Sequence, residues 1–397
     1  MQFKMSDKIM RVKPSAIGEI LKHSSDPSVI AFSAGNPAPE SFPVKAIKQI
    51  IDEIFVENPI GALQYSVTEG YAPLRQALAQ MCAERYGIDM SENEVILTAG
   101  AQQAIDLLCK VICNEGDAVI SENPSFVGAL NSFRAYNTEL LGVEMEEDGI
   151  NIQELENLLK AKPNAKLMYL IPNFQNPSGK TMSWEKRKAV YELAWKYDIV
   201  VIEDNPYGEL RVAGEAVPAI KTIDTEGRVV FTGSFSKILS PGLRVGFIVM
   251  NKALVDKFTV AKQCGDVHTP ILNQMICHKF ITEHDFDAHI KNLQEVYRRK
   301  CTLMLEHIKK NFSEKVKYTV PEGGLFIWCT LPKEVDMMSF CSRAVAEYKV
   351  AVVPGTVFDC DDNAVSQSFR MNFSAVSDEA IIKGCEILGK LTKELLD

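Results

Sequence analysis

Residues 229–246 read VVFTGSFSKILSPGLRVG. The stretch begins as a short run of β-branched and aromatic residues, which predicts a buried strand. A glycine then ends the strand, and a polar segment follows with Ser234, Ser236, Lys237 and, seven residues after the lysine, Arg244. Hydroxyl groups and a guanidinium suit a bound phosphate, and a lysine beside a phosphate-anchored ring is placed to form a Schiff base. A lone lysine is more often an ordinary loop residue, so this hypothesis depends on the rest of the chain.

The composition is typical of a globular protein with a large core. The chain has 397 residues, 46% of them hydrophobic and 24% charged, which is enough for more than one domain. The net charge is −9 and there is no basic run, which argues against a nucleic-acid partner. The start of the chain lacks the apolar core of a signal peptide, and no apolar run is long enough to cross a membrane. We therefore expect a cytoplasmic protein without a membrane partner.

The cysteines and histidines indicate neither disulfides nor a metal site. The ten cysteines are scattered without a C-x-x-C pair, which is typical of reduced and mostly buried thiols. None of the six histidines falls in a metal-binding pattern. We expect no metal.

From residue 95 to residue 250 the pattern strand, loop, helix repeats along the chain. Several strands are continuous apolar runs, which is typical of strands covered on both faces. The pattern predicts an α/β fold with a mainly parallel, seven-stranded sheet between helices. Ligands of such sheets bind beyond the carboxyl ends of the strands, and here polar clusters follow the strands. The predicted strands are Val95–Thr98, Ala118–Ser121, Glu139–Met145, Leu167–Ile171, Ile199–Glu203, Val229–Thr232 and Val245–Met250.

The chain on either side of this sheet predicts helices and a smaller α+β unit, which begins at about residue 318. The expected helices are 15–21, 43–57, 74–86 and 288–312, and a loop is expected at 61–70. The predicted division is an N-terminal segment, 1–44, that packs with the small domain and the functional site, a large domain, 45–285, and a small C-terminal domain, 286–397.

The stretch around Lys237 matches the pattern S-x-S-K-x-x-x-P-G-x-R-x-G. It resembles the lysine motif of the pyridoxal-phosphate-dependent aminotransferases of class I and II, which have the type I fold. The resemblance implies a pyridoxal 5'-phosphate cofactor, held as a Schiff base on Lys237. It also implies that Ser234, Ser236 and Arg244 bind the phosphate. The matching positions are Ser234, Ser236, Lys237, Pro241, Gly242, Arg244 and Gly246.

Two further stretches resemble cofactor-binding parts of this family. Residues 98–103 turn from a strand into a helix, whose free N–H groups and positive dipole end can hold a phosphate. Without the resemblance, these residues would be interpreted equally well as a plain strand-to-helix connection or as a phosphate-binding turn. The family's phosphate-binding turn aligns with Ala101 and Gln102. Phe126, which base rates would place in the core, aligns with an aromatic residue that stacks on the pyridine ring.

Polar residues near two strand ends match the family's ring-binding positions. Asn176 lies in a loop, residues 172–179, that resembles P-x-x-Q-N-P-T/S-G, in which the asparagine bonds the cofactor's phenolic oxygen. Asp204 stands at the exit of a strand and by itself could be a simple strand-end carboxylate. The resemblance places it opposite the pyridine nitrogen, which it would keep protonated. Tyr207 would also bond the phenolic oxygen.

Substrate binding is implied at two further places. In the resembled family the loop with Gly35 and Asn36 covers the substrate, which Asn176 also approaches. Arg370 is an arginine within an apolar strand, where a charge must find an anion. An internal salt bridge would satisfy this arginine, whereas the resemblance implies a bidentate clamp on the α-carboxylate of the substrate.

Residues 63–70 match the family's motif L-Q-Y-x-x-x-x-G. Tyr65 by itself would be interpreted as a packed aromatic residue. In the resembled family the hydroxyl of this tyrosine reaches the cofactor phosphate of the neighbouring subunit. The resemblance therefore implies a homodimer.

The resemblance implies an aminotransferase that moves an amino group from an L-amino acid to a 2-oxo acid, with 2-oxoglutarate as the expected acceptor. The catalytic residues would be Lys237, which moves the proton of the substrate's Cα, together with Asp204 and Tyr207. The motifs are closest to the branch with 2-aminoadipate, kynurenine, and aromatic or branched-chain aminotransferases. Gly18 stands where members that handle dicarboxylic substrates often carry an arginine, which weakens the case for 2-aminoadipate.

Two other functions stay open at this level. A pyridoxal-phosphate lyase acting at Cβ would need the same lysine and the same acid. A regulatory or scaffold protein that only binds the cofactor would retain Lys237, Asp204, Tyr207 and Arg370 without need. Transcription regulators of this branch carry an N-terminal DNA-binding domain, for which the roughly 44 residues before the sheet domain leave no room.

Overall fold

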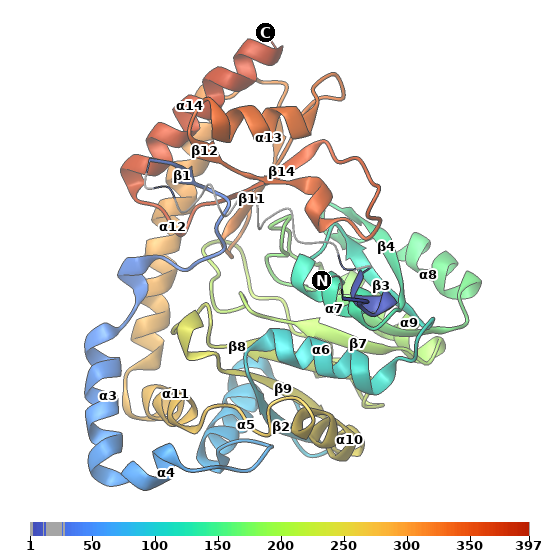
Figure 1. Ribbon diagram of the computed structural model, residues 1–397, viewed down its shortest axis with the longest axis vertical. Coiled ribbons are helices and arrows are strands. Elements are labelled where there is room, and N and C mark those ends of the chain that lie inside the picture. Colours follow the sequence, from blue (N-terminus) through green and yellow to red (C-terminus); the bar gives the residue numbers. More distant parts are fainter. Residues whose placement is uncertain (1–2, 11, 13–25, 27, 397) are drawn as a thin grey trace.

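Two lobes make up the molecule in the computed structural model, which describes residues 3–10, 12, 26 and 28–396. Figure 1 shows a larger lobe built on a twisted sheet and a smaller lobe, coloured orange and red, that holds the carboxyl end. The helix expected at 15–21 lies outside the described residues, and so does Gly18. No described helix is both long and apolar enough to cross a membrane. Across the same residues, no three His, Cys, Asp or Glu side chains are placed to hold a metal ion.

The large lobe contains an eight-stranded sheet, which confirms the α/β fold with a mainly parallel sheet. Its strand order is β2-β9-β8-β7-β6-β3-β4-β5. The strands from β8 to β4 pair in parallel, whereas β9 runs antiparallel to both β2 and β8, and β5 runs antiparallel to β4. The strands are β2 Asn93–Thr98, β3 Ala118–Asn123, β4 Glu139–Glu146, β5 Gly149–Ile150, β6 Ala165–Leu170, β7 Val200–Asp204, β8 Val229–Ser234 and β9 Gly246–Asn251.

All seven predicted strands are present, and their ends differ from the prediction by no more than two residues. The eighth strand, β5, was not predicted, because two residues are too few to show a hydrophobic pattern. It adds only a short edge to the sheet. The central strands are apolar because helices cover both faces, as the absence of exposed surface at Leu167, Val201 and Val230 shows.

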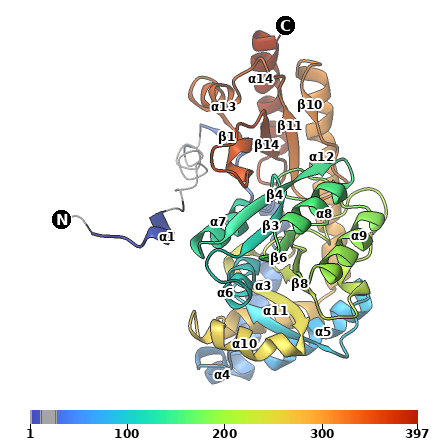
Figure 2. The same ribbon diagram turned by 90° about the vertical axis from the view of Figure 1, so that its right-hand side faces the viewer.

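The helices of the large lobe form two layers. Figure 2 shows α6, α7 and α10 on one side of the sheet and α8 and α9 on the other. The helices of this lobe are α5 Ala72–Tyr86, α6 Ala101–Ile112, α7 Val127–Ala135, α8 Ile152–Ala161, α9 Trp184–Lys196, η2 Ile220–Ile223, η3 Pro241–Leu243, α10 Lys252–Gln263 and α11 Ile271–Glu283.

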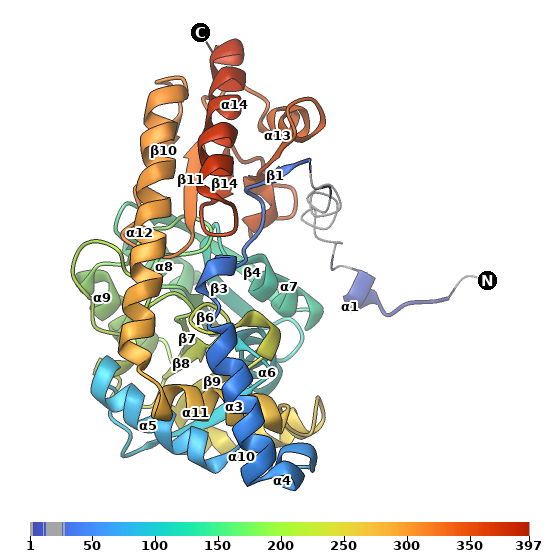
Figure 3. The ribbon, with the colours of Figure 1, turned by 90° about the vertical axis from the view of Figure 1, so that its left-hand side faces the viewer.

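The small lobe contains an antiparallel sheet of order β10-β11-β14-β13. Helices α12 and α14 pack against each other, and α12 continues along the large lobe (Figure 3). The Ser377 hydroxyl accepts the N–H of Ala380 at 3.2 Å and so caps the start of the last helix. The elements are α12 Phe286–Asn311, β10 Lys317–Tyr318, β11 Phe326–Thr330, α13 Met337–Ala346, β12 Val350–Ala351, β13 Val353–Pro354, η4 Gly355–Phe358, β14 Ser368–Asn372 and α14 Asp378–Leu396.

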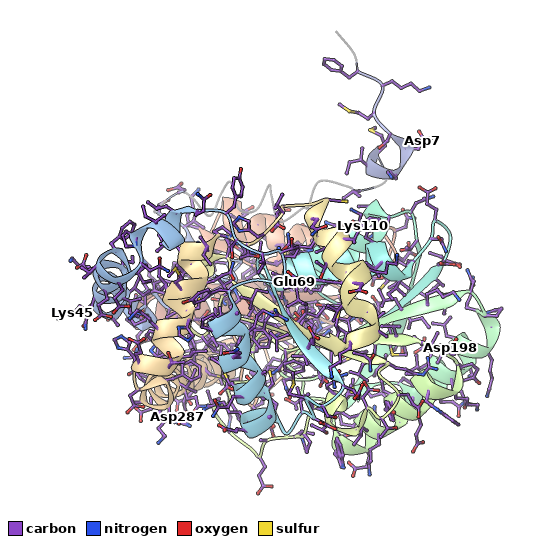
Figure 4. The ribbon with its side chains drawn as sticks, turned by 90° about the horizontal axis from the view of Figure 1, so that it is seen from below. Asp7, Lys45, Glu69, Lys110, Asp198 and Asp287 are labelled. Carbon is purple, nitrogen blue, oxygen red and sulfur yellow. The ribbon has the colours of Figure 1, made fainter. Side chains whose placement is uncertain are left out.

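The chain before the large sheet connects the two lobes. Its β1 pairs in parallel with β12 of the small lobe, and its helices then lie along the large lobe. Figure 4 shows Asp7, on α1, at the edge of the molecule, and α1 lies beside α7 of the large lobe. The elements are α1 Asp7–Met10, β1 Ile30–Ala31, η1 Pro39–Ser41, α3 Val44–Glu57 and α4 Pro59–Leu63. The proposed division of the chain after residues 44 and 285 stays a prediction.

One predicted loop is partly helical. The loop expected at 61–70 begins inside α4, so its first three residues were assigned wrongly. The helix forms because the side-chain oxygen of Asn58 accepts the N–H of Gly61 at 3.1 Å and Pro59 occupies its first turn. A helix of five residues is too short to show a clear period in the sequence.

Candidate active site

A cavity of about 360 Å³ opens at the edge of the large sheet where the parallel strands end. Strand β9 begins at this edge because it runs in the opposite direction. The small lobe closes the cavity with Phe326 of β11 and Arg370 of β14. The lining includes every predicted site residue except Tyr65: Gly35, Asn36, Ala101, Gln102, Phe126, Asn176, Asp204, Tyr207, Ser234, Ser236, Lys237, Arg244 and Arg370.

One end of the cavity gathers groups that suit an anion. The hydroxyl oxygens of Ser234 and Ser236 are 2.9 Å apart. In Arg244, Nη1 lies 3.5 Å from the hydroxyl oxygen of Ser236, and Nη2 donates to the backbone oxygen of Ala99 at 3.0 Å. Helix α6 begins beside them at Ala101, and the first N–H groups of a helix have no partner within it. Two hydroxyls, a guanidinium and a helix N-terminus suit a phosphate.

Gly100 permits the close approach of Arg244 to this helix. Its φ is 79°, and a Cβ at this position would lie 2.5 Å from Nη2 of Arg244. The side chain of Gln102 is engaged elsewhere, since its amide donates to the backbone oxygen of Gly128 and the hydroxyl of Ser132, each at 2.9 Å. Gln102 can therefore offer the phosphate its backbone N–H, while its side chain anchors α7.

Asp204 carries a buried carboxylate oxygen without a partner. This last residue of β7 is 3% exposed. Its Oδ2 accepts a hydrogen bond from the hydroxyl of Tyr169 at 2.7 Å, whereas Oδ1 has no hydrogen-bond partner among the described residues. Burial raises the pKa of Asp204 to about 7. A protonated ring nitrogen would pair with Oδ1 and stabilise the charged form, so Asp204 fits the expected cofactor.

Lys237 is a partly buried amine held by the loop before the large lobe. Its Nζ donates to the backbone oxygen of Gly35 at 2.7 Å, which brings the predicted substrate loop and the predicted lysine together. Burial lowers the pKa of Lys237 to about 8, and the positive charges of Arg370 and Arg244 act in the same direction. A lowered pKa raises the fraction of neutral amine near neutral pH, which is the nucleophilic form.

Arg370 forms no salt bridge with any described residue, so the structure does not show the internal ion pair considered for it. Its Nη1 donates to Oδ1 of Asn176 at 2.8 Å and its Nη2 to the backbone oxygen of Ser33 at 3.0 Å, while Nε has no partner among the described residues. The guanidinium carbon lies 4.2 Å from the ring centre of Phe326 and 4.9 Å from that of Phe358. Burial lowers the pKa of Arg370 to about 10. This buried cation is available for an anionic substrate group.

The remaining predicted residues surround these groups. Burial raises the pKa of the Tyr207 hydroxyl above its usual value, and the positive charge of Arg370 opposes this shift. The ring of Tyr207 meets Phe326 edge-on at 5.8 Å. The backbone oxygen of Asn36 accepts the hydroxyl of Ser374 at 2.7 Å, which ties the N-terminal loop to the small lobe.

The structure does not bring Tyr65 to the cavity of its own chain. The side chain is 82% exposed, and its ring meets His268 edge-on at 5.8 Å. Its predicted role depends on a second subunit.

Sequence reasoning missed four groups around the cavity. Tyr169 and Glu122 are buried polar residues in strands β6 and β3, and their position inside mostly apolar runs is a signal that each needs a buried partner. Glu122 Oε2 accepts the backbone N–H of Ile171 at 3.0 Å. The backbone oxygen of Ser33 and the ring of Phe358 gave no local signal, because only tertiary packing places them beside Arg370.

Comparison with known proteins shows the family of the chain. The model of the family "Aminotransferase class I and II" matches residues 27–388. The chain is 40% identical to aromatic-amino-acid aminotransferase 1 of Thermococcus litoralis over 98% of this chain and 94% of that protein. It is 38% identical to the 2-aminoadipate transaminase of Thermus thermophilus over 97% and 96% of the two chains. The solved structure of Pyrococcus horikoshii kynurenine aminotransferase in complex with PMP has a TM-score of 0.95 to this chain, with 37% identity and coverage of 99% and 98%.

The fold and the cavity are therefore those of an enzyme that depends on pyridoxal phosphate. The chain belongs to the class I and II aminotransferases. Enzymes of this family transfer an amino group between an amino acid and a 2-oxo acid, and this is the reaction of the present chain.

Proposed function

We propose that this aminotransferase takes its amino group from L-amino acids with an aromatic or branched aliphatic side chain. The observation that carries the proposal is the chemistry of the cavity wall. Apolar groups of Ile105, Val127, Ile171, Phe126 and Phe326 line it. A neutral side chain matches such a wall, whereas a second carboxylate would be buried without a counter-ion.

The cations of the wall support the same conclusion. Among the described lining residues they are Lys237, Arg244 and Arg370. We assign these to the cofactor's attachment, its phosphate and the substrate's α-carboxylate, so none is left for a distal acid. Relatives named for aromatic amino acids and for kynurenine are in line with this donor class. 2-Oxoglutarate, our expected acceptor, brings a second carboxylate that this wall does not pair, so its use needs a direct test.

We assign the cofactor contacts as follows. Ser234, Ser236, Arg244 and the N–H groups at the start of α6, Ala101 and Gln102, hold the phosphate. Phe126 would stack on the ring, and Asn176 and Tyr207 would hold its phenolic oxygen. Lys237 would be the amine that holds the cofactor, and Asp204 would pair with the ring nitrogen. When bound, pyridoxal phosphate supplies the sink for the electrons of the substrate's Cα–H bond.

The chain's own residues then orient the substrate and move its proton. Arg370 binds the α-carboxylate through its two terminal nitrogens, which fixes the direction of the Cα–H bond. Burial lowers the pKa of Lys237 to about 8, which raises the fraction of neutral amine near neutral pH, and in this form Lys237 would take the proton from Cα as a general base. The loop with Gly35 and Asn36 covers the substrate and excludes water.

A substrate panel tests the donor class. The holoenzyme is given 2-oxoglutarate together with phenylalanine, tyrosine, kynurenine, leucine, 2-aminoadipate or aspartate, and kcat/KM is measured for each. Phenylalanine is then paired with 2-oxoglutarate, phenylpyruvate or pyruvate as acceptor. We expect phenylalanine, tyrosine and kynurenine to exceed 2-aminoadipate and aspartate by at least about tenfold. A preference for the dicarboxylic donors would contradict the proposal.

A single-turnover experiment separates the transferase from a Cβ lyase. The holoenzyme is mixed with an amino acid and no oxo acid. A transferase changes the cofactor's absorbance once and stops, whereas a lyase continues and releases ammonia. Continued ammonia release would contradict transfer as the main reaction.

We also propose a homodimer in which Tyr65 reaches the partner's phosphate site. An apolar surface around α3 and α4 supports it, since Val56 is 84%, Ile60 73%, Leu63 69% and Tyr65 82% exposed. Such a patch marks an interface. Light scattering should give twice the 44.2 kDa chain mass, and Tyr65→Phe should weaken cofactor binding without changing that mass. A monomer, or unchanged cofactor affinity, would contradict the proposal.

A cytoplasmic location is proposed from the thiols. All ten cysteines are free, and eight of them are buried. Free thiols are typical of a reducing compartment. Cell fractionation with a cytosolic marker tests this, and recovery in a secreted fraction would contradict it.

A further inference from the structure

The loop of the small lobe that follows β13 is fastened to the large lobe beside the cavity. On the large-lobe side, Arg134 of α7 makes three contacts with it through Nη2. It donates to the backbone oxygens of Asp359 at 2.9 Å and Cys360 at 3.1 Å, and it lies 2.9 Å from Oδ1 of Asp362. The arginine side chain is 12% exposed and that of Asp362 36%, so the ion pair is partly shielded from water.

Asn123, at the end of β3, fastens the same segment. Its Oδ1 accepts the N–H of Cys360 at 2.9 Å, and its Nδ2 donates to Oδ1 of Asp359 at 3.3 Å. Close by, the N–H of Ser125 donates to the backbone oxygen of Phe358 at 2.8 Å. We call Asn123, Arg134 and the segment 358–362 the latch. Its two sides come from different lobes.

The latch ends at the residue that packs on the substrate-binding arginine. Phe358 is fully buried, and its ring centre lies 4.9 Å from the guanidinium carbon of Arg370. Phe326 lies 4.2 Å from the same carbon. The strand before this loop pairs with the strand of Arg370, since Val353 is opposite Arg370. The loop therefore leaves the sheet next to Arg370 and is held by the large lobe immediately after Phe358.

We propose that Arg134 and Asn123 are positioning residues for substrate binding: they hold the segment after Phe358, so that Phe358 and Phe326 together fix the plane of the Arg370 guanidinium. The inference rests on the proposed role of Arg370 as the carboxylate clamp. A two-point clamp depends on its plane, because both N–H···O bonds must be straight at once. Nε of Arg370 makes no hydrogen bond within the described residues, so aromatic packing contributes to holding that plane.

The test compares Arg134→Gln with the wild-type holoenzyme. The dissociation constant of 3-phenylpropanoate, a carboxylate without an amino group, is measured by titrating the cofactor's absorbance. We expect it to rise about tenfold, which corresponds to about 1.4 kcal/mol. KM for the amino acid should rise by a similar factor, while kcat stays within about twofold. Arg134→Lys, which keeps the charge and a single donor nitrogen, should recover part of the affinity.

The control is Arg75→Gln. Arg75 also joins a backbone oxygen, that of Val95 at 2.7 Å, and a carboxylate, that of Glu94 at 3.2 Å, but it lies on α5, away from the cavity. We expect no change of affinity in this variant. The inference is overturned if Arg134→Gln changes the dissociation constant no more than Arg75→Gln does, or if kcat falls while the affinity is kept.

Two further variants keep the result unambiguous. If Arg134→Gln fails to fold or to take up cofactor, Asp362→Asn decides instead. Removing the more exposed partner should raise the same dissociation constant about threefold, and an unchanged value overturns the inference. Arg370→Gln tests the underlying assignment. If Arg370→Gln leaves the binding of 3-phenylpropanoate unchanged, the proposed role of Arg370 itself is wrong. If Arg370→Gln weakens this binding but Arg134→Gln and Asp362→Asn do not, only the proposed role of the latch is rejected.

Discussion

The hydroxyl of Tyr169 donates a 2.7 Å hydrogen bond to Oδ2 of Asp204, although the two residues are 35 positions apart in the chain. They lie on the neighbouring strands β6 and β7. The bond occupies one carboxylate oxygen, and the other has no partner among the described residues, as the proposed pairing with the cofactor's ring nitrogen requires. It also lowers the pKa of Asp204 against the opposing effect of burial.

Tyr169→Phe is therefore expected to impair the ionisation of Asp204. Without the hydrogen bond the pKa of Asp204 rises further above its usual range, and more of the acid is neutral at a given pH. The acid limb of the kcat/KM profile should move to higher pH, and kcat at neutral pH should fall about tenfold. Steady-state kinetics as a function of pH measure both effects.

Tyr191→Phe is the matched control for this prediction. Its hydroxyl also makes a side-chain hydrogen bond, to Thr225 at 3.2 Å, on the exposed surface of the large lobe. We expect no displacement of the pH profile in this variant. An acid limb that stays in place in Tyr169→Phe would show that Tyr169 does not tune Asp204.

Covalent uptake of the cofactor should depend on pH through Lys237. Its pKa is about 8, so the rate of uptake by the cofactor-free protein should rise with pH and level off above about 8. Because Arg370 lowers this pKa through its positive charge, Arg370→Gln should move the inflection to higher pH. Stopped-flow absorbance gives the rates. Borohydride should then fix the cofactor to residue 237, and a fixed label in Lys237→Ala would contradict the assignment.

Arg370→Gln should separate substrate binding from cofactor binding. Loss of a two-point, charge-assisted contact costs about 1.5 to 3 kcal/mol, which predicts KM values raised about tenfold to a hundredfold for both the amino acid and the oxo acid. The cofactor's absorbance should persist, because the proposed phosphate contacts are untouched. An unchanged KM would assign the carboxylate to another residue.

Glu122→Gln should change how the stability of the cofactor-free protein depends on pH. Burial raises the pKa of Glu122 from 4.5 to about 7. Because the pKa of Glu122 is higher in the folded than in the unfolded protein, its contribution to stability is fully present below the pKa of the unfolded state. This contribution is lost as the pH rises through the pKa of the folded state. The wild type should therefore lose up to about 3 kcal/mol between about pH 5 and about pH 8 from this residue.

Glutamine keeps an oxygen that can accept the N–H of Ile171, and it does not titrate. The slope of the free energy of unfolding against pH should therefore be smaller in Glu122→Gln, though not zero, because Asp204 contributes in the same direction. Urea unfolding at a fixed protein concentration measures it. An identical slope would mean that Glu122 is ionised in the fold at low cost.

Local pattern predicted the strands that carry some of the site residues, whereas the roles of these residues came from the resemblance to the aminotransferase motifs and stay predictions. Asp204 and Ser234 are the last residues of buried strands, and strands of a parallel sheet end at one edge. Locating the strands thus located the cavity. The predicted role of Tyr65 requires a partner subunit, because within its own chain this residue lies exposed on the surface.

The sequence by itself determined the strands, their order of appearance and the polar residues that follow them, because burial leaves its period in neighbouring residues. Only the tertiary structure decided the partner of each buried polar group. Arg370 meets Asn176 across 194 positions and Ser33 across 337, and Arg134 meets Asp359 across 225. Such pairs arise when two lobes pack together, and no local pattern records which residues will then face each other.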